Sequence, residues 1–316
     1  MTRYLTAATL TLCLTAAVPA LGQSVGIATS NPGGLFYNIG TAVATAANAE
    51  GLTMTVQPAT SSNQYIPFVN DNGTEFGVSN LQEIEYALDG AEWWDGKAYP
   101  NLRIVAFLQP LAEAIFVRKD SGITDISQLR GRRVADGYIA QQTLLPQLSA
   151  IYANAGMSRD DVEQVPVASI VAGVDGFLAG DLDAFLMADG AGKVREADAA
   201  VGGLRALAVE DPSDAGLAKA REFWPTAEFV TLRAGSMPGV LEDSVHVAFP
   251  QVIFTNKDVP DDVVYLLAKA MYEKADLMGA TFRAMKAFKP MDMHGRTIAA
   301  QFHPGALKFY KEAGLD

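Results

Sequence analysis

The stretch HVAFPQVIFT, residues 246–255, is an unusually long apolar run of strand-forming residues with Pro250 at its centre. A proline has no N–H to donate to a β ladder, so it is expected at a sheet edge or at a bend. Two further apolar runs, Arg103–Leu108 and Glu113–Arg118, are separated by only four residues. We expect the chain to pass between two lobes twice, outward at Glu113–Arg118 and back at residues 246–255, which would create a hinge with a cleft beside it.

The remainder of the chain alternates short apolar runs with helical patterns, which is typical of parallel α/β structure. It contains no internal repeat and no low-complexity stretch. The predicted fold class is therefore α/β with two lobes. Lobe one is predicted to comprise residues 23–112 and 251–316, and lobe two residues 113–250, with the two crossover strands forming the hinge.

The composition narrows the range of partners. The chain has 316 residues, of which 49% are hydrophobic and 19% charged, so it can bury a large core. Its formal net charge of −12 would repel nucleic acid and anionic membrane surfaces, and we expect neither as a partner. Beyond the N-terminus, no apolar run approaches the roughly 20 residues that a membrane-spanning helix needs. We expect a protein that is not membrane-embedded and that is a monomer.

The N-terminal residues indicate export. Arg3 is the only charged residue among the first 49, and residues 4–18 form a mostly apolar run of 15, too short to span a bilayer. Ala20-Leu21-Gly22 then supplies small residues at the −3 and −1 positions of a cleavage site. The sequence therefore predicts a cleaved signal peptide over residues 1–22 and a mature protein in the periplasm. The alternative is a buried helix at the start of a cytosolic domain.

Nothing in the mature chain indicates catalysis. Cys13, the only cysteine, lies in the predicted signal peptide behind Leu12, where a lipoprotein signal needs a small residue. The remaining 294 residues (316 − 22) contain no thiol, no HExxH pattern and no glycine-rich phosphate loop with a lysine. His246, His294 and His303 are not spaced as ligands of one metal, and His303 before Pro304 is expected to begin a helix. We therefore expect no enzyme, no metal and no cofactor.

Five polar loops follow predicted strands and precede predicted helices, where free backbone N–H groups and the helix dipole favour ligands. They are nearly uncharged and rich in hydrogen-bond donors, which suits a small anion or zwitterion. The predicted ligand-binding residues of lobe one are Ser30, Asn31, Gly33, Gly34, Phe36, Tyr37, Thr60, Ser61, Ser62, Asn63, Ser79, Asn80 and Gln82. Those of lobe two are Asp136, Gln141, Gln142, Thr143, Asp189 and Lys193.

Structural roles would explain several of these residues equally well. Ser61 or Ser62 would cap the following helix whatever its function. For Lys193, the first charged candidate, the alternative is a solvated lysine. The loop after the first strand, with its two glycines, is also expected of a plain turn.

Several motifs, in order along the chain, resemble those of TAXI proteins, the solute receptors of tripartite ATP-independent periplasmic (TRAP) transporters. The matching stretches are residues 33–40 (GGLFYNIG), 60–63, 101–104, 115–118, 121–134, 183–185, 258–265 and 303–312. The resemblance extends over essentially the whole mature chain. It implies a type II periplasmic binding-protein fold. It also implies delivery of a small carboxylate, glutamate-like or a dicarboxylate, to TRAP membrane subunits driven by an ion gradient.

Two loops at the predicted cleft depart from this family. Many relatives carry Gly-Ser-Gly-Thr where this chain has AQQT, residues 140–143, and glycine-x-proline where it has GAG, residues 190–192. The usual ligand of the family therefore does not carry over directly. The alternative functions are a binding protein of an ABC permease or sensor kinase, and an enzyme built on the same fold.

The export signal leads to a first prediction. In a host that processes bacterial signal peptides, cleavage after Gly22 should give a periplasmic protein whose N-terminal sequencing begins at Gln23. A protein that retains Met1, in either the periplasm or the cytosol, would contradict the assignment.

Overall fold

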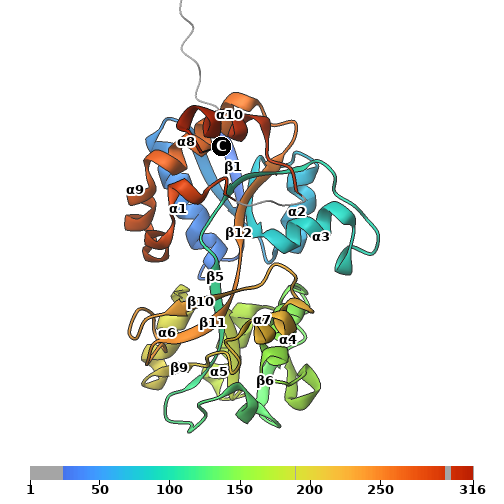
Figure 1. Ribbon diagram of the computed structural model, residues 1–316, viewed down its shortest axis with the longest axis vertical. Helices are drawn as coiled ribbons and strands as arrows, with labels where there is room; N and C mark the ends of the chain where they lie inside the picture. The colour runs from blue at the N-terminus through green and yellow to red at the C-terminus, as the bar shows by residue number, and fades with distance from the viewer. Residues whose placement is uncertain (1–23, 189, 296–299, 316) are drawn as a thin grey trace, which may run out of the picture.

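The computed structural model describes residues 24–188, 190–295 and 300–315, and its two lobes lie one above the other in Figure 1. Each lobe contains its own β-sheet with helices packed against it, so the predicted α/β class is confirmed. The lobe with the five-stranded sheet is called lobe one below, and the lobe with the seven-stranded sheet lobe two. The predicted signal peptide and Asp189 lie outside the described residues.

Lobe one is a three-layer unit. Its sheet has the order β2-β1-β3-β12-β4, in which β12 is antiparallel to both of its neighbours. The strands are β1 (Ser24–Thr29), β2 (Thr53–Pro58), β3 (Phe76–Asn80), β4 (Leu102–Phe107) and β12 (Gln251–Asn256). The helices are α1 (Leu35–Ala49), α2 (Ser62–Asn70), α3 (Leu81–Asp89), η1 (Glu92–Trp94), α8 (Asp261–Glu273), α9 (Ala275–Thr281), η4 (Arg283–Ala287), η5 (Pro290–Asp292) and α10 (Pro304–Ala313).

Alternating residues of the lobe-one strands face two separate cores. Ile27 and Ile253 pack with α1, α8, α9 and α10, whereas Ala28 and Phe254 pack with α2 and α3 on the opposite face. This division follows from the period of two along a strand, and Figure 1 shows the two groups of helices on either side of the sheet. His303 begins α10 as expected, because its ring accepts a hydrogen bond from the backbone N–H of Gly305, 3.1 Å away.

Lobe two contains a mixed sheet in the order β10-β11-β5-β8-β6-β7, with β9 also paired to β5. The strands are β5 (Leu111–Arg118), β6 (Arg133–Asp136), β7 (Glu163–Pro166), β8 (Ala184–Ala188), β9 (Leu204–Ala206), β10 (Glu228–Leu232) and β11 (Ser244–Phe249). The helices are η2 (Ile126–Leu129), α4 (Leu144–Asn154), η3 (Arg159–Asp161), α5 (Ile170–Ala179), α6 (Gly192–Val201) and α7 (Asp214–Arg221). One continuous hydrophobic core fills this lobe.

The chain passes between the two sheets twice. Residues 108–110 connect β4 to β5, and Pro250 alone separates β11 from β12. The crossings are tied together, because Leu108 N donates to Gln251 O over 2.9 Å and Leu81 N donates to Pro250 O over 2.8 Å. Pro250 therefore lies at the break between two strands of different sheets, as its chemistry predicts. The residue limits proposed for the lobes stay a prediction. Strand β12 begins at Gln251, in line with the second limit, whereas β5 begins two residues before Glu113.

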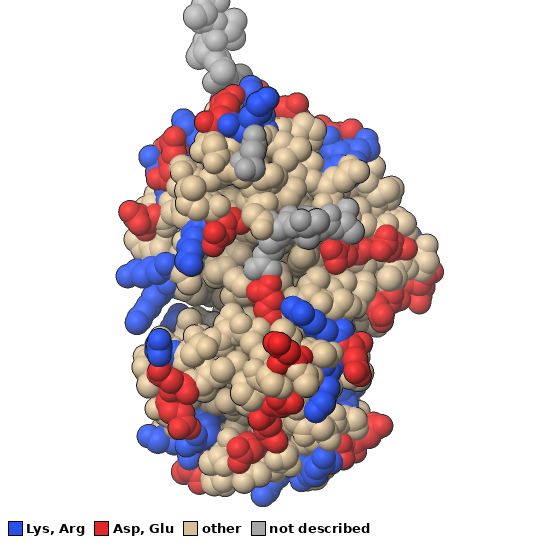
Figure 2. Space-filling model, in the orientation of Figure 1, with Lys and Arg blue, Asp and Glu red and all other residues tan. Residues whose placement is uncertain are grey.

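The surface carries both signs of charge. Figure 2 shows acidic and basic side chains interspersed over both lobes on the face in view. Such mixing offers no extended basic area for a polyanion on this face. Within the part of the chain that the structure describes, no helix is long and apolar enough to cross a bilayer.

Trp224 joins the lobes at a second place. Its fully buried ring lies edge-on to Tyr86 of α3, with ring centroids 6.3 Å apart, and to Phe249 at the end of β11, with centroids 5.3 Å apart. Nearby, Thr226 N donates to Gln82 Oε1 over 3.1 Å. Helix α3 of lobe one thus rests on lobe two through one aromatic and one polar contact. Burial raises the pKa of Tyr86 to about 12, which keeps its phenol neutral.

These contacts predict the effect of shortening Trp224. Trp224→Ala should lower the free energy of unfolding by about 3–5 kcal/mol, because a fully buried aromatic ring is lost and a cavity remains. The neighbouring Phe223 is 44% exposed and serves as the matched control. Phe223→Ala should change the same quantity by no more than about 0.5 kcal/mol in urea unfolding. Equal losses in the two variants would be incompatible with this packing.

Candidate functional site

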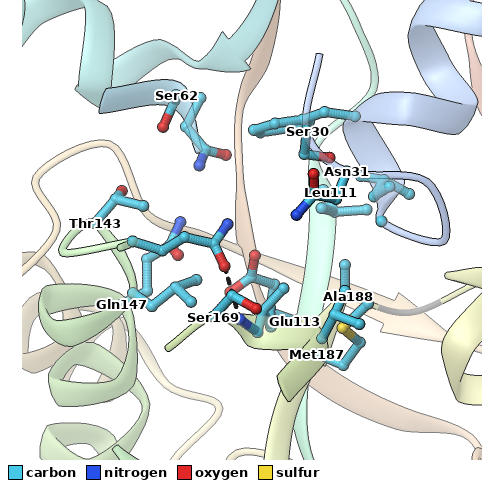
Figure 3. A pocket seen from close by; sticks show the side chains of 18 of the residues that line it. Ser30, Asn31, Ser62, Leu111, Glu113, Thr143, Gln147, Ser169, Met187 and Ala188 are labelled. Atoms are coloured by element: carbon cyan, nitrogen blue, oxygen red, sulfur yellow. Dashed lines mark hydrogen bonds between the residues drawn. The ribbon is translucent and has the colours of Figure 1, made fainter. Parts of the chain in front are cut away.

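A cavity of about 60 Å³ lies between the lobes. Figure 3 shows it from close by, with Ser30 and Asn31 on one side and Thr143, Gln147, Ser169 and Glu113 on the other. The polar lining residues are Ser30, Asn31, Thr60, Ser62, Asn80, Glu113, Gln141, Thr143, Gln147 and Ser169. The apolar ones are Gly34, Leu35, Phe36, Leu111, Leu144, Ile170, Val171, Met187 and Ala188.

The lobe-one side of the cavity is built around the start of α1. Gly33 has φ +90°, a conformation that favours glycine, and Gly34 is the N-cap of the helix. A Cβ on Gly34 would lie 2.7 Å from Ser30 Oγ and 3.1 Å from Asn31 O, so any larger residue here would displace the Ser30 hydroxyl. No described side chain caps α1, and Ser30 Oγ has no hydrogen-bond partner among the described residues. The helix N-terminus and this hydroxyl are therefore left to a ligand or to solvent.

A buried carboxylate holds the next two loops in place. Glu83 is fully buried and accepts hydrogen bonds from the Ser62 hydroxyl, from Ser79 Oγ over 2.7 Å, and from both Asn80 N and Asn80 Nδ2 over 3.2 Å. Gln251 of β12 donates in turn to Asn80 Oδ1. Because four donors satisfy one carboxylate, Ser62 and Asn80 are fixed at the edge of the cavity.

The lobe-two side is formed by the starts of α4 and α5. Gln141 Oε1 accepts a hydrogen bond from Ile170 N over 2.7 Å, and Ser169 caps α5 by accepting from Ala172 N over 3.2 Å. Thr143 is the N-cap of α4, yet its side chain makes no capping bond. Gln147 lies one turn further on the same helix face. The amide oxygen of Gln141 is thus bonded within lobe two.

Gln147 is the most unusual polar group of the site. Its side chain is fully buried, and neither its amide nitrogen nor its amide oxygen bonds to any described residue. Thr143 Oγ1 is unpartnered in the same sense. Buried amides and hydroxyls are nearly always hydrogen-bonded, because leaving one unsatisfied costs about 1–3 kcal/mol. Groups in this state beside a cavity are the expected mark of a binding site that forms its bonds with a ligand.

Glu113 supplies the only charge among the described lining residues. It belongs to β5, is 6% exposed, and stands opposite Ala188 of β8 and Val247 of β11 in the sheet. Lys, Arg and His are all absent from the described lining. The cavity therefore presents amides, hydroxyls and one carboxylate.

The structure brings nine of the sequence-predicted residues to this cavity. They are Ser30, Asn31, Gly34, Phe36, Thr60, Ser62, Asn80, Gln141 and Thr143. Three more, Ser61, Asn63 and Gln142, line a neighbouring cavity of about 340 Å³ together with Trp93, Trp94 and Ile139. Neither Ser61 nor Ser62 makes the expected capping bond, since Ser62 donates to Glu83 and the Ser61 hydroxyl has no described partner.

The other predicted residues lie outside the lining. Ser79 belongs to the Glu83 network, and Gln82 bonds Thr226 between the lobes. Asp136 is buried and bonded by the Arg159 guanidinium, and Gly33 and Tyr37 are not among the lining residues.

Lys193, the first charged candidate of the sequence analysis, is not among the residues that line the cavity. It forms ion pairs with Glu196 at 2.8 Å and Asp175 at 2.9 Å, and these bonds raise its pKa. Since α6 begins at Gly192, Lys193 lies in the first turn of that helix beside α5. Its ammonium is thus paired within the protein.

Sequence reasoning missed Glu113, Gln147 and Ser169. Each left a signal. Glu113 is a single acid in the otherwise apolar run 111–117. Gln147 follows Thr143 by four residues, a spacing that puts both on one helix face. Ser169 precedes the apolar helix 170–179 as an N-cap.

Comparison with known proteins places this site in context. The chain matches the model of the NMT1-like family over residues 27–314. MatC from Rhodopseudomonas palustris with bound malate has a TM-score of 0.56 and 13% identity, covering 83% of this chain and 88% of that one. A protein from Bordetella bronchiseptica RB50 has a TM-score of 0.55 and 12% identity, and the match covers 92% of this chain and 98% of that one.

The alkanesulfonate-binding protein SsuA from Xanthomonas axonopodis pv. citri, bound to MOPS, has a TM-score of 0.50 and 14% identity, covering 89% of each chain. At such identities the likeness concerns the fold, which is that of periplasmic binding proteins. Within the described ranges, no group of three or more His, Cys, Asp or Glu side chains is arranged to hold a metal ion.

The contrast between the two cleft glutamines yields a prediction. Gln147→Met should leave the free energy of unfolding of the ligand-free protein unchanged or raise it, because an unbonded buried amide is replaced by an apolar group of similar size. Gln141→Met, the matched control, should lower it by about 1–3 kcal/mol, because Ile170 N loses its acceptor. Urea unfolding measures both. A Gln147→Met loss as large as that of Gln141→Met would show that Gln147 is bonded within the protein.

Proposed function

The chain belongs to the NMT1-like family, and on this basis we propose that it is a periplasmic solute-binding protein. It captures a small organic acid in the cleft between its lobes and passes it to a membrane permease. The cavity, rather than any catalytic group, is the feature from which this function is argued. It is lined from both lobes, so a bound solute would hold the lobes together and shift the molecule toward its closed form.

The observation that carries the proposal is the convergence of helix N-termini. Helices α1, α2 and α4 all begin at the cavity, and no described side chain caps any of them. Their N-termini carry partial positive charge and N–H groups, which together favour a carboxylate. The unpartnered groups of Ser30, Thr143 and Gln147 add donors from both sides. An acid can thus be neutralised without a buried counter-charge and its desolvation cost.

The proposed partner is a TRAP-type permease, with this chain as its TAXI-type receptor. The ordered motifs from residues 33 to 312 support this choice. Uptake by cells that carry the receptor and its membrane subunits should stop when the ion gradient is dissipated. Uptake that continues without the ion gradient and requires ATP would instead assign the chain to an ABC permease.

Ligand affinity should locate the site. The small molecule released from the purified protein is identified by mass spectrometry and titrated calorimetrically into the ligand-free protein. Thr143→Val removes a hydroxyl without a described internal partner and should weaken binding about 5- to 150-fold, equivalent to roughly 1–3 kcal/mol.

Ser61→Ala is the matched control, because its hydroxyl is also unpartnered but faces the neighbouring cavity. It should change the affinity by no more than about twofold relative to the wild-type protein, which is less than the loss of one hydrogen bond would cause. The reverse pattern, with Ser61→Ala weak and Thr143→Val normal, would move the ligand to the neighbouring cavity. Release of no small molecule, and no binding of any organic acid, would remove the proposal altogether.

A further inference from the structure

We infer that the solute is a monocarboxylate of only two or three carbons, and that the Val171 side chain sets this limit on its length. Dicarboxylates and longer acids are then excluded from the cavity. This inference rests on the proposed function, since it names the class of organic acid that the same site binds.

The cavity between the lobes is small for an organic acid. Its volume is about 60 Å³, and a single water needs about 10–15 Å³, so the cavity has room for roughly four to six non-hydrogen atoms. Acetate, propionate, lactate and pyruvate lie within this range, whereas succinate, malate and glutamate exceed it. A solute of the larger kind would fit only if the walls of the cavity moved apart.

Contacts between the lobes hold these walls at their present separation. At the start of α6, a Cβ on Gly192 would lie 3.9 Å from Gly33 O, an ordinary van der Waals distance between lobe two and lobe one. The hydrogen bond from Thr226 N to Gln82 Oε1 joins the lobes at a second place. A solute that widened the cavity would have to break these contacts. The lobes themselves therefore set the volume.

The cavity is also bounded on the side of its larger neighbour. Successive residues of one loop alternate between the two spaces: Thr60 and Ser62 line the cavity of the site, whereas Ser61 and Asn63 line the neighbouring one. This loop thus forms a wall between the two cavities. A longer acid cannot extend from one into the other without displacing the loop.

The chemistry of the lining favours one charged group in the solute. Apolar side chains from both lobes line the cavity beside the polar ones, and Figure 3 shows Met187 and Ala188 across from Thr143 and Gln147. A second carboxylate would lose its hydration against these apolar side chains, and the described lining offers no Lys, Arg or His to pair with it. A methyl or methylene group meets the same side chains favourably.

Val171 is the apolar lining residue best suited to limit the length of the solute. It is the second residue of α5, and it lines the cavity, so its methyl groups occupy space that a longer chain would need. Leu144 and Met187 line the cavity as well, but both belong to the lobe-two core. Val171 belongs to none of the three hydrophobic cores. Its size can therefore change without loss of core packing.

Calorimetry with a series of acids tests the inference. The wild-type protein should bind at least one of acetate, propionate, glycolate, lactate and pyruvate about tenfold or more tightly than butyrate, pentanoate, succinate, malate and glutamate. Val171→Ala removes two methyl groups and should strengthen butyrate about tenfold relative to propionate. The matched control, Val167→Ala, shortens a half-buried valine outside the lining and should preserve the wild-type order.

The outcomes separate the two claims. If the wild-type protein binds a dicarboxylate or an acid of four or more carbons as tightly as the short acids, the inference is overturned and the proposed function stands. A folded Val171→Ala protein with the wild-type order would overturn the role of Val171. If Val171→Ala does not fold, Val171→Ile decides, because its added methyl group should weaken propionate about tenfold relative to acetate.

If no acid of the series binds, the mass of the molecule released from the protein decides. A monocarboxylate of two or three carbons supports the inference, and any other carboxylate overturns it. Absence of any bound or released carboxylate overturns the proposed function, and the inference with it.

Discussion

The double crossing of the chain between its lobes is the constraint on which the site depends. Because Pro250 cannot donate a hydrogen bond, the run 246–255 divides into β11 and β12, which belong to different sheets. The bonds of Leu81 N to Pro250 O and of Leu108 N to Gln251 O fix this point against β3 and the start of the other crossing. The cavity lies beside these strands, so Asn80 and Glu113, on opposite lobes, reach it within a few residues of the hinge.

The buried polar groups around Glu83 are fully hydrogen-bonded within the protein, whereas those of Gln147 and Thr143 are not. Glu83 is surrounded by donors from Ser62, Ser79 and Asn80, and so forms a closed network that shapes lobe one. Gln147 and Thr143 in lobe two are equally buried but make no described side-chain bonds. A satisfied network stabilises a fold, whereas an unsatisfied group stores free energy that a ligand can recover. The difference supports the Glu83 network as a preformed part of the site, and Gln147 and Thr143 as groups that gain their bonds on binding.

Sequence patterns were enough for the α/β class and for the break at Pro250, because strand ends, helix starts and a central proline have local signatures. They were not enough for the direction of individual side chains. Ser61 and Ser62 are neighbours at the start of α2, yet one lines the neighbouring cavity and the other bonds Glu83, since Ser61 is the N-cap with extended backbone and Ser62 is the first helical residue. Lys193 pairs with Asp175, a partner that only the packing of α6 on α5 supplies. Glu113 was read as part of a structural strand, because the sequence does not show that β5 begins at the cavity.

The most direct test of a solute-binding cleft is a crystal structure of the protein purified without added ligand from a host of its own type. We expect electron density for one small molecule in the cavity, with its carboxylate at the start of α1 or α4 and a bond to the Gln147 amide. Density for water alone in a closed cleft, or for a molecule confined to the cavity lined by Ser61 and Gln142, would contradict the account.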